Sequence, residues 1–166
     1  MAMREDRKTL ELLAAIAKVV EVPVPASASA LASMTRPEAV RIIENRYSDF
    51  KLRNDNETLT SPELEATLKG NTIYGAPYNN DPYVLSFHPG GEGHMKVRGR
   101  EPEVGTWWIN SDDTIHSKWE EAASGKDIAV RYYRTANPFI LLHEAANREL
   151  PPVECRMCIV QPGLAF

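Results

Sequence analysis

From residue 71 onward, the chain alternates short segments rich in β-branched and aromatic residues with clusters of turn-forming residues. This feature constrains the fold most, because short strands spaced about 8 to 14 residues apart are typical of an antiparallel sandwich or barrel. Within the segments the side chains alternate, so that Tyr83, Leu85 and Phe87 would share one face of a strand. The expected strands cover residues 72–75, 82–88, 94–100, 105–110, 114–119, 127–134, 138–144 and 153–160.

Two helix-start signals precede this β-rich part. Thr35 and Glu38 have the spacing of a capping box, and the helix that follows would end near Tyr47. Ser61 would cap a second, shorter helix, with Pro62 in its first turn. We therefore expect one domain over residues 35–166, with helices in 35–69 and the strands in 70–166.

Residues 1–34 allow two interpretations. Basic residues, an apolar run and the small-residue stretch "PASASALA" follow one another in the order of a secretory signal peptide. Glu11, Lys18 and Glu21 interrupt the apolar run, however, and an amphipathic helix followed by a Pro/Ala/Ser linker explains the same segment. The apolar face of that helix would carry Leu12, Leu13, Ile16, Val19 and Val20. The first interpretation places the protein in the periplasm or outside the cell, and the second leaves it in the cytoplasm.

Composition narrows the classes of partner. The chain has 166 residues, 43% of them hydrophobic and 25% charged, with a formal net charge of -4. These values are ordinary for a globular domain, and the acidic balance argues against nucleic acid, which needs a basic face. The sequence contains no run of about 20 uncharged apolar residues, so we expect no transmembrane segment. The sequence does not indicate an oligomeric state.

The two cysteines, Cys155 and Cys158, form a single C-x-x-C. A zinc knuckle needs a second pair of ligands, and a thioredoxin-type motif should begin a helix rather than lie in a late apolar run. On a straight strand, residues three apart point to opposite faces. We therefore favour two independent structural thiols, with a local disulfide at a bend, or redox or metal chemistry, as the alternatives.

The stretch "HPGGEGH", residues 88–94, could be a phosphate loop, a metal clamp or a tight turn. A phosphate loop should open a helix, whereas the segment after this one has a strand pattern. Strand patterns on both sides favour a hairpin, whose tip needs the positive φ that glycine supplies. His88 and His94 could face each other across it and begin a metal site, but a closed site needs three or four ligands. We therefore predict polar residues at strand ends, no metal and no cofactor.

The sequence contains no identifiable catalytic nucleophile and no G-x-S-x-G motif. The acidic pairs at residues 112–113 and 120–121 lie in turn-like places, which favours solvated side chains over catalytic ones. Trp107 and Trp108 would point to opposite faces of one strand, one into the interior and one outward. We assign no catalytic residue.

Four segments in order, "GNTIYG", "YVLSFHPGGEG", "GTWWINSDDTIHSKW" and "IAVRYYR", resemble a family of uncharacterised bacterial proteins, the DUF995-like domain of unknown function. The resemblance covers residues 62–144. It implies an exported, lipocalin-like β-barrel of unknown activity, and it supplies no catalytic residues. This chain has His116 and Ala129 near the places where that pattern often has cysteines, so the disulfide expected from the family is missing.

Three functions follow from an antiparallel lipocalin-like barrel of about eight strands. The first is the binding of a small apolar or amphipathic ligand in the barrel interior. The residues expected to line it are Tyr74, Tyr83, Phe87, Trp107, Trp119, Tyr132 and Phe139. The second is an envelope structural or interaction protein with a filled barrel and no ligand. The third is a hydrolase-like enzyme that uses His88, His94 or His116 as acid–base groups.

Overall fold

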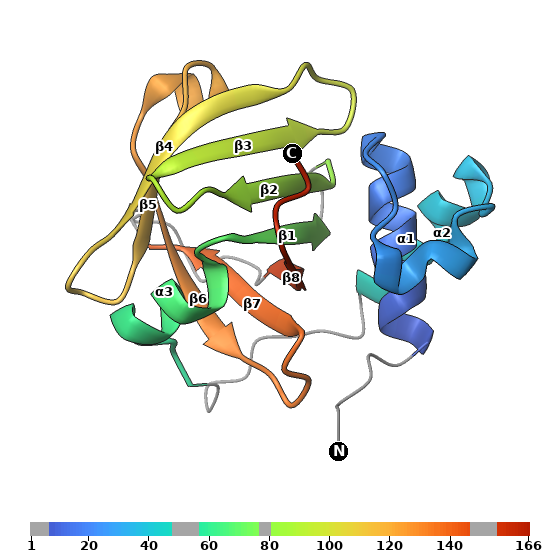
Figure 1. Ribbon diagram of the computed structural model, residues 1–166, viewed down its shortest axis with the longest axis horizontal. Helices are drawn as coiled ribbons and strands as arrows, with labels where there is room; N and C mark the ends of the chain where they lie inside the picture. Colours follow the sequence, from blue (N-terminus) through green and yellow to red (C-terminus); the bar gives the residue numbers. More distant parts are fainter. Residues whose placement is uncertain (1–6, 48–56, 77–80, 147–155) are drawn as a thin grey trace.

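The protein folds into a closed β-barrel with two N-terminal helices set against one side of it (Figure 1). The computed structural model describes residues 7–47, 57–76, 81–146 and 156–166. The strands are β1 (Asn71–Ala76), β2 (Tyr83–Phe87), β3 (Glu92–Val97), β4 (Glu103–Ile109), β5 (Ile115–Lys118), β6 (Ile128–Arg134), β7 (Ile140–Ala145) and β8 (Arg156–Pro162). Each pairs antiparallel with its neighbours in sequence, and β8 returns to pair with β1. The predicted α+β fold class and its eight-stranded antiparallel barrel are confirmed.

The stretch "HPGGEGH" forms the hairpin between β2 and β3. Phe87 pairs with Gly93, and the backbone N–H of Gly91 donates a hydrogen bond of 3.0 Å to the His88 carbonyl. Gly91 has a φ of 92°, a conformation that L side chains rarely adopt. The hairpin interpretation is therefore confirmed.

The helices are α1 (Arg7–Val20), α2 (Arg36–Tyr47) and α3 (Ser61–Leu68), with short 3-10 turns η1 (Ala26–Leu31) and η2 (Ala122–Gly125). The capping box that begins α2 is confirmed. The Glu38 backbone N–H donates to the Thr35 hydroxyl (3.3 Å), and the Thr35 N–H donates to the Glu38 carboxylate (3.2 Å). Helix α2 ends at Tyr47, as expected.

The predicted cap of α3 is displaced by one residue. Thr60 is the cap, and the Glu63 carboxylate accepts hydrogen bonds from its backbone N–H (3.2 Å) and hydroxyl (2.8 Å). Ser61 instead anchors the helix to the β4–β5 turn: its hydroxyl donates to the Asn110 carbonyl at 2.7 Å, and its N–H to the Asp113 carboxylate at 2.6 Å. Asp113, expected to be solvated, thus holds α3 in place.

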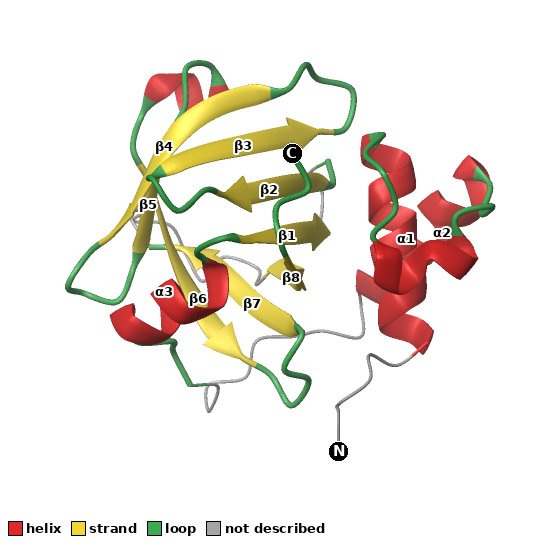
Figure 2. Cartoon of the chain, in the orientation of Figure 1, coloured by secondary structure: helices red, strands yellow, loops and turns green. Residues whose placement is uncertain are grey.

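Helix α1 lies between the barrel and α2 (Figure 2). Its Leu12, Leu13, Ile16 and Val20 belong to one buried cluster with the barrel's outward-facing side chains. The barrel residues of this cluster are Tyr74, Ala76, Val84, Ile140, Leu142, Met157 and Ile159. On its other side, α1 packs Ala15 and Val19 against Ala39 of α2. Four of the five residues expected on the apolar face of this helix therefore pack against the barrel, whereas the fifth, Val19, faces α2. None of the described helices is long and apolar enough to cross a membrane.

Candidate functional site

The barrel interior, where we expected a ligand, is occupied by the protein's own side chains. One buried cluster contains the aromatic residues Phe87, Trp107, Trp119 and Tyr132, with Tyr83 packed against it. Its remaining buried members are Leu59, Leu64, Leu68, Ile73, Leu85, Ile115, Leu141, Cys158 and Val160. Leu64 and Leu68 come from α3, which therefore contributes side chains to the interior of the barrel.

Three glycines make room for the aromatic rings. A Cβ atom on Gly75 would lie 2.3 Å from the ring of Tyr83, and one on Gly93 would lie 2.9 Å from the ring of Trp119. A Cβ atom on Gly105 would lie 2.5 Å from the Trp119 ring as well. Contacts below 3.0 Å are sterically forbidden, so each ring occupies the space that a side chain would otherwise take. Small barrels often fill their interior by setting large residues beside small ones in this way.

Two of the seven residues expected to line the interior are placed elsewhere. Tyr74 points outward and is buried under the N-terminal helices, where its pKa is raised to about 12 by burial. Phe139 lies in the turn before β7 and is half-buried. The other five, Tyr83, Phe87, Trp107, Trp119 and Tyr132, belong to the interior cluster or pack against it. Trp107 and Trp108 point to opposite faces as predicted, with 8% and 38% of their surfaces exposed.

A small polar group lies among these interior side chains. The Tyr83 hydroxyl and His143 Nε2 share a hydrogen bond of 2.9 Å, and the Tyr132 ring lies 5.5 Å from the His143 ring. Burial raises the pKa of Tyr132 well above its ordinary value. His143, which sequence reasoning did not select, is buried on β7 and faces Tyr83 across the barrel. A buried histidine whose ring nitrogen is hydrogen-bonded in this way holds its neighbours in position and is not accessible to solvent.

Cys158 is a free, buried thiol on β8, as the structural interpretation predicted, whereas Cys155 lies outside the described residues. Burial raises the pKa of Cys158 from 9.0 to about 12. The thiolate is the reactive form, so Cys158 should resist iodoacetamide at pH 8 in the folded protein and react after denaturation. Peptide mass mapping of the alkylated site tests this, and labelling of Cys158 in the folded protein at the rate of a free thiol would contradict it.

The same shift sets a direction for the dependence of stability on pH. In the unfolded chain Cys158 ionises near its ordinary pKa of 9.0, while in the folded protein it stays protonated until about pH 12. Its contribution to stability is therefore complete below pH 9 and is lost as the pH rises through this interval.

The three histidines considered as acid–base groups lie at two places. His88 and His94 come together on the β2–β3 hairpin, with ring centroids 4.1 Å apart. His116 lies on β5, stacks on Trp108 at 5.5 Å, and faces the Asp127 carboxylate through Nδ1 at 3.1 Å. Its Nε2 lies 3.0 Å from the Thr114 hydroxyl, which is buried. This arrangement resembles a triad in connectivity, but a buried hydroxyl cannot reach a substrate from solvent.

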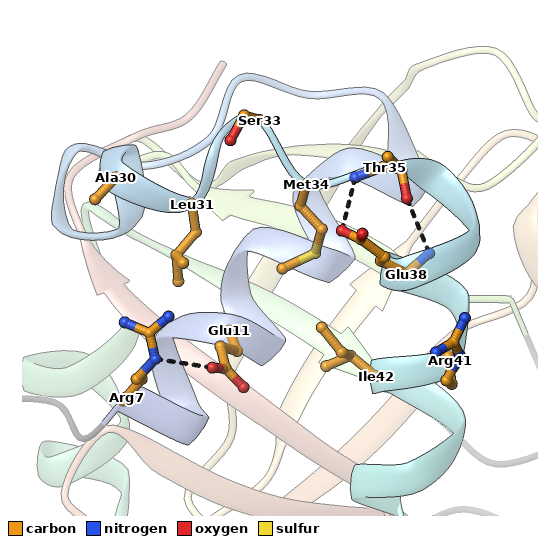
Figure 3. Close-up of a pocket in the computed structure, with 10 residues that line it drawn as sticks. All are labelled: Arg7, Glu11, Ala30, Leu31, Ser33, Met34, Thr35, Glu38, Arg41 and Ile42. Carbon is orange, nitrogen blue, oxygen red and sulfur yellow. Dashed lines mark hydrogen bonds and ion pairs between the residues drawn. The ribbon is translucent and has the colours of Figure 1, made fainter.

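A groove of about 530 Å³ lies outside the barrel, between α1, η1 and α2 (Figure 3). Leu31, Met34 and Ile42 supply its apolar side chains, while Arg7 and Arg41 lie at its two ends. Its remaining lining residues are Glu11, Ala30, Ser33, Thr35 and Glu38. A volume of this size falls in the range typical of small-molecule sites, about 300 to 1,000 Å³. The groove therefore offers open volume outside the barrel, whose interior the described side chains occupy.

The charged residues of the groove differ in their partners. Arg7 pairs with Glu11 at 3.0 Å, and the Glu38 carboxylate caps α2. Arg41 is exposed and makes no hydrogen bond or ion pair with any residue in the described part of the chain. An unpaired guanidinium beside an apolar floor is suited to an anion that carries an apolar body.

No protein-family model and no curated protein matches this chain. The DUF995-like family suggested by the sequence motifs is therefore not shown, and what the structure confirms of that resemblance is its β-barrel.

Proposed function

We propose that the protein binds a small amphipathic anion, and that the ligand lies in the groove between α1, η1 and α2. The observation that carries this proposal is Arg41, which has no partner among the described residues and lies at one end of a groove whose apolar side chains are Leu31, Met34 and Ile42. The guanidinium would bind a carboxylate or a similar head group, and the apolar side chains would cover a short hydrocarbon body. The barrel then serves as the rigid support of the helices rather than as the container.

The proposed ligand is of the class expected from the sequence, small and amphipathic, but its site is outside the barrel and not in its interior. A ligand inside the barrel would have to displace aromatic rings that already occupy the interior, such as Trp119 over Gly93 and Gly105. A ligand in the groove displaces only solvent, because the lining side chains of α1 and α2 already surround an open volume. The filled interior therefore supports a site outside the barrel.

Octanoate and its neutral analogue octanol provide the test. We expect octanoate to bind more tightly than octanol to the wild-type protein in calorimetric titrations. Substitution Arg41→Gln should weaken octanoate binding about tenfold, the equivalent of roughly 1.4 kcal/mol, and should leave octanol binding nearly unchanged. Arg98→Gln, at an exposed position between β3 and β4, is the matched control and should bind both compounds as the wild type does.

A second candidate is a structural or interaction protein with a filled barrel and no ligand. The filled interior favours it, and so do Val104 and Trp108 on the outward face of β4, which are 54% and 38% exposed. Apolar side chains that share one exposed face of a strand are suited to contact with another protein. If neither octanoate nor octanol binds to the wild-type protein, this second candidate replaces the first.

The site of action is a separate proposal. The leader-like order of residues 1–32 supports export, whereas the burial of Leu12, Leu13 and Ile16 against the barrel supports a mature protein that keeps α1. We propose that α1 is retained in the mature protein wherever it acts. N-terminal sequencing of the protein from fractionated cells tests this, and a mature chain that begins after residue 32 would contradict it.

A further inference from the structure

A cluster of three possible metal ligands lies on the hairpin between β2 and β3, apart from the groove. His88, Glu92 and His94 each offer one ligand atom, and these atoms lie within 4.8 Å of one another. His94 pairs with Ser86 across the hairpin, and Glu92 lies two residues before His94 on the same face of β3. His88 follows β2 directly. The hairpin thus brings the residue that follows β2 and two residues of β3 to one place on the outer face of the barrel.

The backbone that carries these ligands is held firmly in place. The Trp107 indole N–H lies 3.0 Å from the His88 carbonyl and 3.1 Å from the Glu92 carbonyl, so that it donates to both ends of the turn. The His88 N–H donates to the Glu92 carbonyl at 2.8 Å, and the Trp107 N–H donates to the Gly91 carbonyl at 2.9 Å. A metal would therefore meet a preformed loop rather than order a flexible one.

Acceptor oxygens already lie next to both imidazoles. The Nε2 atom of His88 lies 2.8 Å from the backbone oxygen of Phe166, and His94 Nε2 contacts the Glu92 carboxylate. The segment before Phe166 is fixed on the barrel, because the Ala165 N–H donates to the Thr72 hydroxyl at 3.0 Å. Nitrogen and oxygen atoms that converge in this way can exchange their mutual hydrogen bonds for bonds to one cation.

In place of the expected absence of a metal, we propose that His88, Glu92 and His94 bind a divalent transition-metal ion of the zinc class. Two imidazoles and one carboxylate are a donor set typical of Zn²⁺. Softer ions such as Cu⁺ prefer sulfur ligands, and harder ions such as Mg²⁺ and Ca²⁺ prefer oxygen ligands. Three protein ligands leave a fourth position for water or for the Phe166 backbone oxygen. Glu92 and His94 are partly exposed, so the ion can enter from solvent. This inference does not depend on the function proposed for the groove.

Zinc titration of the metal-stripped protein tests the site. We expect one equivalent of zinc to bind to the wild type, and His88→Gln and His94→Gln each to weaken binding at least tenfold. His116→Gln is the matched control, because His116 is also a surface histidine next to a carboxylate but belongs to no cluster of three such ligands among the described residues. It should bind zinc as the wild type does.

A second readout guards against misfolded variants. Zinc should raise the melting temperatures of the wild type and of His116→Gln and leave those of His88→Gln and His94→Gln unchanged. Before zinc is added, all four proteins should have the same far-ultraviolet circular dichroism spectrum. Absence of zinc binding to the wild type would overturn the proposal. Equal binding and equal stabilisation in the two hairpin variants would overturn it as well.

Discussion

Replacement of Ile16 by alanine is expected to lower the free energy of unfolding by about 2–5 kcal/mol. Ile16 lies on α1 with 0% of its surface exposed, in the cluster that joins this helix to the outer face of the barrel. The truncation removes apolar contacts between α1 and the barrel. It also leaves a cavity that neither the helix nor the barrel can close by moving. Urea denaturation followed by circular dichroism measures the change.

Lys8→Ala is the matched control for this substitution. Lys8 lies on the same helix but is exposed, so its replacement should change stability by no more than about 0.5 kcal/mol. If Ile16→Ala proved as stable as Lys8→Ala, α1 would not be part of the folded core. A chain without residues 1–32 would leave the outer faces of β1, β2, β7 and β8 uncovered, and we expect it to aggregate or unfold.

Replacement of Gly105 by alanine is expected to lower the free energy of unfolding by about 1–3 kcal/mol, because the interior has no room for one more methyl group. The added Cβ atom would lie 2.5 Å from the Lys118 carbonyl oxygen and 2.5 Å from the Trp119 ring. The first of these neighbours belongs to the backbone of the paired strand β5 and cannot swing away. The second is a buried ring, with 3% of its surface exposed, that could move only by displacing the side chains packed around it. Denaturant unfolding measures this effect too.

Gly90→Ala provides the comparison. A Cβ atom on Gly90 meets no other atom within 4 Å, and its φ is not positive, so the substitution should be nearly neutral. Equal stability of Gly105→Ala and Gly90→Ala would show that the interior contains space near Trp119. That result would restore a ligand inside the barrel as the better hypothesis.

The strands could be predicted because their residues carry the signal themselves. Gly90 and Gly91 mark the β2–β3 turn, and Tyr83, Leu85 and Phe87 alternate inward as the period of two requires. The capping box at Thr35 is equally local. These features depend on neighbours along the chain, which is why the sequence alone was sufficient.

The predictions from sequence fail where tertiary packing determines the direction or the partner of a side chain. All but the first residue of β1 are buried, because α1 covers the outer face, so alternation could not show that Tyr74 points outward. Ser61 and Asp113 meet 52 residues apart, a contact that no local pattern encodes. Glu92 was missed as the third member of the histidine cluster, although its i, i+2 spacing from His94 would have placed both on one face. The groove depends on how three N-terminal segments pack together, which the sequence did not indicate.

Side chains fill the barrel interior, and we propose that the ligand binds outside it, in the groove between α1, η1 and α2. The most direct test is a ¹⁵N-labelled protein titrated with octanoate and followed by the amide chemical shifts. We predict shifts along residues 30–42, including those of Leu31, Arg41 and Ile42, and no shifts for interior strand residues such as Leu85 and Tyr132. Shifts centred on Leu85 and Tyr132, with residues 30–42 unmoved, would contradict the claim and place the ligand inside the barrel.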